Sequence, residues 1–161
     1  MTPASPDTVP ASPELEFVVE LRVKIGAITE IGTTESSVRR VVPITGGDFS
    51  GPHLAGRVLP VGADWQLAES GGLTLVDARY VLESEDGVHI EIRNRGVRRA
   101  DPAVLNRLAA GESVDPHEYY FRTAPQFMAP DGKYSWLRRF VFVGTAERYP
   151  DLVVVRVWKV L

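Results

Sequence analysis

Seven polar and aromatic side chains in this sequence have the chemistry of a small-molecule site. They are Asp64, Trp65, Tyr80, Asn94, Tyr120, Arg122 and Trp136. A carboxylate can act as a general acid or base, a phenol can donate a hydrogen bond to an oxyanion, and a guanidinium can bind a carboxylate through two hydrogen bonds. We therefore expect Asp64, Tyr80 and Tyr120 to be catalytic. The expected ligand-binding residues are Trp65, Asn94, Arg122 and Trp136.

Two classes of function fit these residues. In the first, the protein is a cofactor-independent cyclase, isomerase or lyase that acts by proton transfer on an aromatic, polyketide-like or carboxylated molecule. In the second, it binds or carries a lipophilic molecule, and Asp64 and Arg122 form a buried structural ion pair, which does not by itself indicate catalysis. Tyrosine and tryptophan most often contribute to a core, so the aromatic residues alone do not separate the two classes.

Composition and motifs argue against several other kinds of site. The chain of 161 residues has no cysteine, which excludes disulfides, thiolate nucleophiles and cysteine-bound zinc. Its three histidines, His53, His89 and His117, lack the spacing of metal ligands, so no metal site is expected. There is no glycine-rich phosphate loop between a strand and a helix and no nucleophile-elbow sequence, and no cofactor is expected.

The charge distribution and the N-terminus bear on partners and location. The net charge is −3 and the arginines are scattered, so there is no continuous basic surface for nucleic acid. The sequence MTPASPDTVPASP has neither the basic start nor the apolar stretch of a signal peptide. Apolar runs are too short to span a bilayer. We expect a cytoplasmic protein with no membrane partner.

Alternating polarity predicts the strands that must position the candidate residues. Every second residue from Leu15 to Ile25 is apolar, and residues 37–44 have strand composition interrupted at Pro43. The segment Gly46 to Leu67 contains five glycines and two prolines. We expect it to form two tight turns around a short strand, residues 53–59, at a corner of the scaffold or a wall of the site.

The register of the next hairpin follows from its side chains. A two-residue loop at Asp86 and Gly87 would pair apolar with charged residues on both faces. A three-residue loop with Gly87 in the left-handed conformation instead places the inner residues opposite one another. The expected inner pairs are Leu82 with Ile90, Tyr80 with Ile92, and Ala78 with Asn94. The outer pairs would be Asp77 with Arg95, Glu83 with His89, and Arg79 with Arg93.

One helix and about eight strands are expected in all. Asp101 is a typical N-cap, Pro102 fits the first turn, and Gly111 follows the end of a helix over residues 102–110. Strand composition returns at residues 117–123, 137–145 and 152–160. These elements predict an all-β fold, a small antiparallel β-barrel or sandwich, and a barrel is favoured because closure removes unpaired edges. Residues 14–161 would form this single domain after a disordered tail, residues 1–13.

The final strand suggests self-association. Val153, Val155 and Val157 point to one side, whereas Val154 and Trp158 point to the other, so both faces are apolar. A strand buried on both faces needs a second covering surface, which could be the helix or another subunit. We expect a homodimer.

Several spaced motifs follow one another in a fixed order: the glycine-rich segment, DARYVLESEDGVHIEIRNRGVRR, YYFRTAPQF, YSWL and FVGTAERYPD. Together they resemble the bacterial and fungal DUF3237 family, also called UPF0311. The resemblance extends from Glu14 to Leu161 and implies a small β-barrel without an assigned general function. Arg138 follows YSWL where the family pattern leads us to expect asparagine. If that position lines the family's pocket, this chain prefers a different ligand.

Overall fold

The computed structural model describes residues 9–161, and the first eight residues of the predicted tail lie outside them. Nine strands, one α-helix and two short 3-10 helices follow in order. They are β1 (Leu15–Ile25), β2 (Thr29–Thr33), β3 (Ser37–Ser50), β4 (Ala55–Glu69), β5 (Leu73–Ser84), β6 (His89–Arg99), α1 (Pro102–Ala109), η1 (Pro116–Glu118), β7 (Tyr120–Met128), η2 (Ser135–Arg138), β8 (Phe142–Arg148) and β9 (Leu152–Val160).

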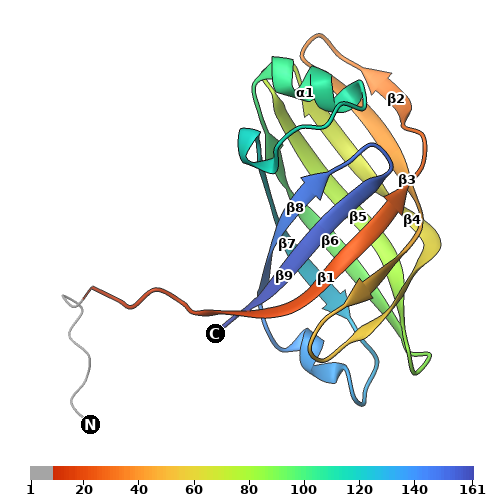
Figure 1. Ribbon diagram of the computed structural model, residues 1–161, viewed down its shortest axis with the longest axis vertical. Coiled ribbons are helices and arrows are strands. Elements are labelled where there is room, and N and C mark those ends of the chain that lie inside the picture. Colours follow the sequence, from red (N-terminus) through yellow and green to blue (C-terminus); the bar gives the residue numbers. More distant parts are fainter. Residues whose placement is uncertain (1–8) are drawn as a thin grey trace.

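The long strands form a closed antiparallel barrel of eight strands (Figure 1). Each strand pairs with its neighbours in the order β1-β9-β8-β7-β6-β5-β4-β3, and pairing of β1 with β3 closes the ring. The short strand β2 adds to the free edge of β3. Closure gives each of the eight long strands a neighbour on both sides, although β7 and β8 pair only through Arg122 with Thr145 and Thr123 with Gly144. The predicted barrel is confirmed.

The glycine-rich segment differs from its predicted form. It is not two turns around a short strand: β3 continues to Ser50, the chain turns at residues 51–54, and β4 then runs through Asp64 and Trp65. The glycines are needed where the backbones of neighbouring strands approach each other closely. A Cβ at Gly47 would lie 2.0 Å from the Arg22 carbonyl oxygen, and one at Gly62 would lie 2.1 Å from that of Arg79. Both glycines have positive φ. The segment therefore forms a corner of the scaffold, which was one of the two predicted roles.

The hairpin of β5 and β6 has the predicted register. Leu82 pairs with Ile90, Tyr80 with Ile92 and Ala78 with Asn94, and Gly87 has φ +82°. On the outer face, Arg79 and Arg93 lie opposite each other, and two like charges in this position would repel each other. Each arginine instead binds a carboxylate diagonally across the hairpin: Arg79 donates to Glu91, and Arg93 donates to Asp77.

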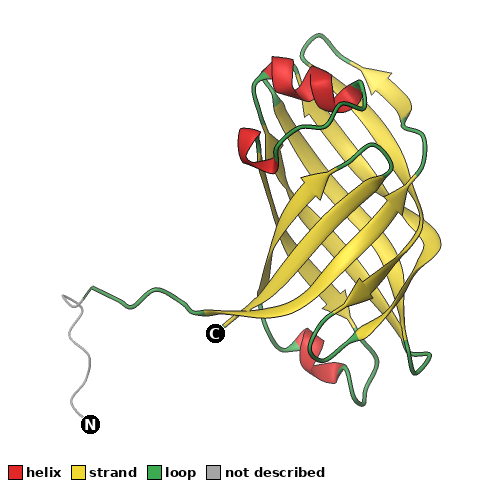
Figure 2. Cartoon of the chain, in the orientation of Figure 1, coloured by secondary structure: helices red, strands yellow, loops and turns green. Residues whose placement is uncertain are grey.

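Helices close the two ends of the barrel (Figure 2). At one end, α1 begins at the N-cap Asp101, whose side chain accepts from Ala103 N, and Gly111 has φ +77° just after the helix, as predicted. At the other end lies η2, which buries Leu137. It replaces the first part of the strand expected over residues 137–145, since β8 begins only at Phe142. None of the helices in residues 9–161 is long and apolar enough to cross a membrane.

The core fills the η2 end of the barrel. Phe127 and Phe142 pack edge to face there with ring centroids 5.1 Å apart, and Leu82, Ile90 and Ile92 are fully buried. Large buried side chains pack against one another at this end. The α1 end is different, because its inward positions carry smaller and more polar residues.

One apolar residue on the outer face of β9, Val154, is covered by the chain itself. Val155 and Val157 belong to the core, and Val154, on the opposite face, is only 3% exposed in the single chain. Its direct neighbours in register are Arg22 on β1 and Glu147 on β8. Val154 therefore needs no second subunit to bury it.

Candidate functional site

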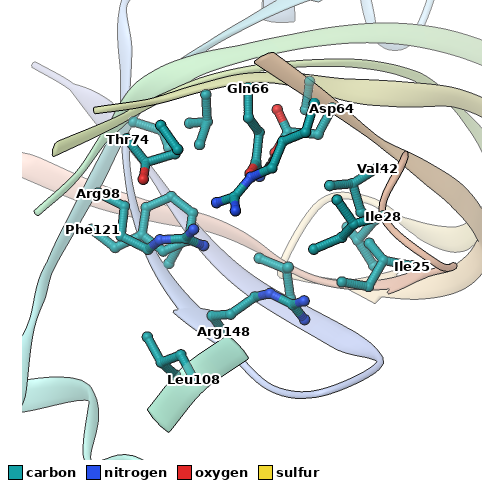
Figure 3. Close-up of a pocket in the computed structure, with 18 of the residues that line it drawn as sticks. Ile25, Ile28, Val42, Asp64, Gln66, Thr74, Arg98, Leu108, Phe121 and Arg148 are labelled. Atoms are coloured by element: carbon teal, nitrogen blue, oxygen red, sulfur yellow. Dashed lines mark hydrogen bonds between the residues drawn. The ribbon is translucent and has the colours of Figure 1, made fainter. Parts of the chain in front are cut away.

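A cavity of about 200 Å³ occupies the barrel interior beneath α1 (Figure 3). Several inward positions of the surrounding strands are alanines, including Ala68, Ala78 and Ala146, so the interior is not filled. Leu105 and Leu108 of α1 cover the mouth. An apolar cavity of about 150 Å³ can accept a benzene molecule, so this one has room for a small organic ligand.

Asp64 lies on the wall of this cavity. Its Oδ1 accepts a hydrogen bond from Asp77 N at 2.9 Å, and its Oδ2 accepts one from Gln66 Nε2 at 2.6 Å. Burial raises the pKa of its carboxyl group, because the charged form loses hydration, although the two hydrogen bonds oppose the shift. Among residues 9–161, no cation lies within ion-pair distance of Asp64.

Gln66 connects this carboxylate to the first of three cavity arginines. Its side-chain Oε1 accepts a hydrogen bond from Arg40 Nε at 2.8 Å. The two residues face each other across β3 and β4, and each reaches into the cavity from the position that alternation assigns to the inner face. Burial lowers the pKa of Arg40, whereas Asp64 raises it.

Arg98 of β6 is the most deeply buried of the three arginines, with 6% of its surface exposed. Its Nε has no hydrogen-bond partner among the described residues, and its guanidinium lies over the Phe121 ring, 5.6 Å from the centroid. Burial lowers the pKa of Arg98 to about 10, and the nearby positive charges of Arg40 and Arg148 act in the same direction. Figure 3 shows Arg98 and Arg148 directed into the same space.

Arg148 approaches from the end of β8 and is anchored at the rim. Its Nη1 donates to the carbonyl oxygens of Tyr149 and Pro150. Its backbone N–H donates to the Tyr119 hydroxyl at 2.9 Å. Burial lowers the pKa of Arg148 as well. Three guanidinium groups and the carboxylates of Asp64 and Glu69 therefore line a single cavity, with an excess of one positive charge.

Neutral polar side chains line the part of the cavity nearest the core. Tyr80 is 3% exposed, and burial followed by the charge of Asp64 raises its pKa, so it remains a neutral phenol at physiological pH. Asn94 Oδ1 and Thr123 Oγ1 are buried and have no partner within residues 9–161. In this region of the chain no group of three or more His, Asp or Glu residues is arranged to hold a metal ion.

Comparison with known proteins identifies the family. The family model described as a protein of unknown function, DUF3237, matches residues 13–160. The chain belongs to the DUF3237 family. A UPF0311 protein from Rhodopseudomonas palustris is 39% identical over 148 residues, which cover 92% of this chain and 97% of that protein.

Solved structures with this DUF3237 fold come from several organisms. A conserved protein of unknown function from Rhodopseudomonas palustris has a TM-score of 0.89 at 38% identity, covering 95% of this chain and all of that one. A beta-barrel like protein from Acinetobacter baumannii has a TM-score of 0.81 at 40% identity over 95% and 99% of the two chains.

A more distant relative carries a reaction in its name. A hydroalkoxylation enzyme from the fungus Penicillium herquei is 21% identical to this chain over 151 residues, covering 94% of this chain and 86% of that protein.

The structure brings three of the seven candidate residues of this DUF3237 chain together. Asp64, Tyr80 and Asn94 all line the cavity. They lie on neighbouring strands of the β4-β5-β6 sheet, where Asp64 pairs with Ala78 and Ala78 pairs with Asn94. The grouping of Tyr80 with Asn94 follows from the predicted hairpin register, whereas Asp64 joins them through the pairing of β4 with β5.

Arg122, which was expected to bind the ligand or to form a buried ion pair with Asp64, does not lie inside the barrel. Alternation in β7 does group Arg122 with Tyr120, but Phe121 and Thr123 take the inner face and the other two are exposed. Arg122 instead lies over the Tyr120 ring on the outer surface, 5.2 Å from its centroid, so the pairing with Asp64 does not occur. Alternation shows which residues share a face but does not show which face is inside.

The two candidate tryptophans, Trp65 and Trp136, also lie away from the cavity. Trp65 is 51% exposed because it alternates with the inward Asp64 and Gln66 on β4. Trp136 belongs to η2 at the opposite end of the barrel, where it packs near Phe142.

Arg138, the departure from the family pattern, also lies at the η2 end and forms an ion pair with Asp131. It does not line the cavity beneath α1.

Several polar residues of the site were not expected, among them Arg40, Gln66, Arg98, Arg148 and Thr123. One of them had a signal in the sequence. Arg98 lies four residues after Asn94, so the same alternation that placed Asn94 inside also placed Arg98 inside. Arg40 and Arg148 come from strands in which the two faces do not differ clearly in polarity, so alternation does not show that these residues point inward. Only the closed barrel brings them close to Arg98.

Proposed function

We propose that this DUF3237 barrel binds a small organic anion in the cavity beneath α1 and transfers a proton to or from it through Asp64. One observation carries the binding proposal. Arg98 is buried, forms no ion pair within residues 9–161, and shares the cavity with two further arginines. A buried charge without a partner is unfavourable, and an anionic ligand would compensate it.

The arrangement of Asp64 supports acid–base chemistry. Its pKa is raised by burial, which moves it toward neutral pH, where a proton donor or acceptor is most effective. The neutral Tyr80 phenol can donate a hydrogen bond to an enolate or other oxyanion formed when the proton moves. Arg40, Arg98 and Arg148 would hold the anionic end of the ligand.

This chemistry corresponds to a redox-neutral cyclisation, isomerisation or elimination. The reaction in the name of the Penicillium herquei relative, hydroalkoxylation, adds an O–H group across a carbon–carbon double bond. It therefore also requires proton transfer to carbon and an activated hydroxyl. The likeness in sequence is remote, and it supports the type of reaction rather than a particular substrate. Non-catalytic binding or transport of the same ligand is the alternative that the experiments below separate.

Calorimetric titration of benzoate into the protein tests the binding part. Native mass spectrometry of the purified protein would first show whether a small molecule is already bound. We expect Arg98→Met to weaken benzoate binding by about 10- to 100-fold, the range for a charge-assisted hydrogen bond. Arg95→Met is a matched control, because Arg95 lies on the same strand and is exposed. Equal losses in the two variants would contradict a specific anion site.

Deuterium exchange tests the catalytic part. Phenylpyruvate is a carboxylate with acidic C–H bonds, and nuclear magnetic resonance can follow their exchange in D2O. An enzyme with Asp64 as base should exchange these hydrogens above the buffer rate. Asp64→Asn should abolish the excess rate, and Tyr80→Phe should lower it by about 10- to 100-fold. Binding of phenylpyruvate without any excess exchange would favour the carrier function.

A second copy of the chain and a cytoplasmic location complete the proposal. An apolar strip on the outer surface includes Leu15, Phe17 and Trp158, and the first two are 54% and 38% exposed. Phe17 and Trp158 already pack edge to face, with centroids 5.9 Å apart. Homodimerisation would bury this strip, and sedimentation at tens of micromolar tests it. A strictly monomeric species would exclude the dimer.

The proposed cytoplasmic location rests on the lack of cysteine in the sequence.

A further inference from the structure

The cavity contains a second set of polar groups that lack partners. Asn94 Oδ1 and Thr123 Oγ1 are buried, and neither has a hydrogen-bond partner among residues 9–161. The two residues are 4% and 7% exposed, and both line the cavity. Buried polar side chains in native proteins nearly always have partners, so two orphaned groups beside one cavity call for an explanation.

Of these two neutral groups, Asn94 lies away from Arg98, and Thr123 lies between Asn94 and Arg98. Asn94 and Arg98 share the inner face of β6 and are four residues apart, which separates their Cα atoms by roughly 13 Å along the strand. Thr123 pairs with Gly96, midway between them. Tyr80, a third neutral hydrogen-bonding group, pairs with the fully buried Ile92. The cavity therefore has a cationic end beneath α1 and, next to the core, a polar end formed by Asn94, Tyr80 and the Asp64 carboxylate, with Thr123 between the two ends.

The walls between these two ends are largely apolar. Val42, Val76, Phe121 and Val155 all line the cavity. The Phe121 ring already lies beneath the Arg98 guanidinium. A ligand that spans the cavity would place an apolar or aromatic middle against these side chains, where its burial is favourable.

We infer that the site is built for a hydroxy acid with an apolar, ring-sized middle. Its carboxylate would bind the arginine cluster of Arg40, Arg98 and Arg148, and its hydroxyl group would bind Asn94 and Thr123. A hydroxyl both donates and accepts, so it can satisfy the Asn94 carboxamide and the Thr123 hydroxyl together. This inference rests on the proposed anion site and adds the second polar group of the ligand.

Two matched pairs of acids test the inference. 4-Hydroxybenzoate is compared with benzoate, and 6-hydroxy-2-naphthoate with 2-naphthoate, by calorimetric titration into the full-length protein. The second pair places the hydroxyl farther from the carboxylate, so the pairs sample two distances between the polar ends. We expect at least one hydroxy acid to bind about three- to tenfold more tightly than its parent acid, the value of one neutral hydrogen bond.

Two variants locate the effect. Thr123→Val keeps the shape of the side chain and removes its hydroxyl, whereas Asn94→Leu removes the carboxamide. Each should reduce the advantage of the hydroxy acid while leaving the affinity for the parent acid within about twofold. The comparison of acids in the wild-type protein needs no variant, so it stands even if Asn94→Leu fails to fold.

The outcomes separate this inference from the proposed function. If the parent acids bind through Arg98 but the hydroxyl adds nothing in either pair, the inference is overturned and the anion site stands. An advantage that survives in both variants also overturns it, because the hydroxyl must then bind elsewhere. If none of the four acids binds at millimolar concentration, the proposed anion site itself fails.

Discussion

Gln66 donates its Nε2 hydrogen to Asp64 Oδ2 over 2.6 Å, and its carbonyl oxygen is held by Arg40. The amide thus has its donor directed at a carboxylate and its acceptor directed at a guanidinium. Only this orientation of the carboxamide satisfies both neighbours. Gln66 bridges two opposite charges, and its hydrogen bond stabilises the ionised form of Asp64.

Gln66→Glu should therefore raise the pKa of Asp64. The substitution removes the hydrogen-bond donor and places a second carboxylate beside the first, and like charges disfavour ionisation. The pH midpoint of phenylpyruvate exchange should move upward. Gln66→Met, which removes the donor without adding charge, should move it by a smaller amount. A downward shift in the Gln66→Glu variant would contradict the assigned role of this amide.

Asp64→Asn should change how stability depends on pH. The carboxyl pKa is raised in the folded protein, so the unfolded chain loses its proton first, near pH 4. As pH rises from there through the folded pKa, the wild type should lose stability relative to Asp64→Asn. Denaturant unfolding of both proteins between pH 4 and 8 measures the difference.

Asp77→Asn provides a control of opposite sign. A hydrogen bond from Arg93 is the largest cause of the lowered pKa of Asp77. The wild type should therefore gain stability relative to Asp77→Asn as pH rises toward about 4, and the difference should then stay constant. If Asp64 behaved like Asp77, it would be an ion-paired structural group and the proposed acid–base role would be lost.

Arg98→Met should stabilise the protein while it weakens anion binding. Burial, together with repulsion from Arg40 and Arg148, lowers the pKa of Arg98 from 12.5 to about 10, which corresponds to a cost of roughly 3 kcal/mol for holding the charge in the cavity. Loss of the contact with Phe121 offsets part of the gain, so we expect a net increase of about 2 kcal/mol in the free energy of unfolding. The exposed control Arg95→Met should change it by less than about 0.5 kcal/mol. A strongly destabilised Arg98→Met protein would show that another group compensates the charge in the free barrel.

Gly144→Ala tests the packing beside the cavity. A Cβ at this position would lie 2.4 Å from Thr123 Oγ1, which is too close for any contact. We expect a loss of about 1–3 kcal/mol in stability, typical of overpacking. In a Thr123→Ala background the obstructing oxygen is absent, so the same substitution should cost less than half as much. Equal costs in both backgrounds would place the strain elsewhere.

The strand pattern and the hairpin register could be predicted from the sequence because they depend on neighbouring residues. Alternation in residues 73–99 places Tyr80 and Asn94 on one face, and the position of Gly87 sets the register that joins them. The helix after Asp101 could be predicted for the same reason, since its cap and its end are local signals. The glycine-rich segment was harder, because its glycines are required by contacts with strands far away in the chain.

Only the closed barrel decided which charged residues meet. Arg40, Arg98 and Arg148 come from three strands that are distant in sequence, and their convergence depends on strand tilt and on closure between β1 and β3. Tertiary packing also selected the inner face of β7, where Phe121 and Thr123 displaced the expected Tyr120 and Arg122. Alternation divides a strand into two faces, but the face that is buried depends on which neighbours supply a core, and that information is not local to the strand.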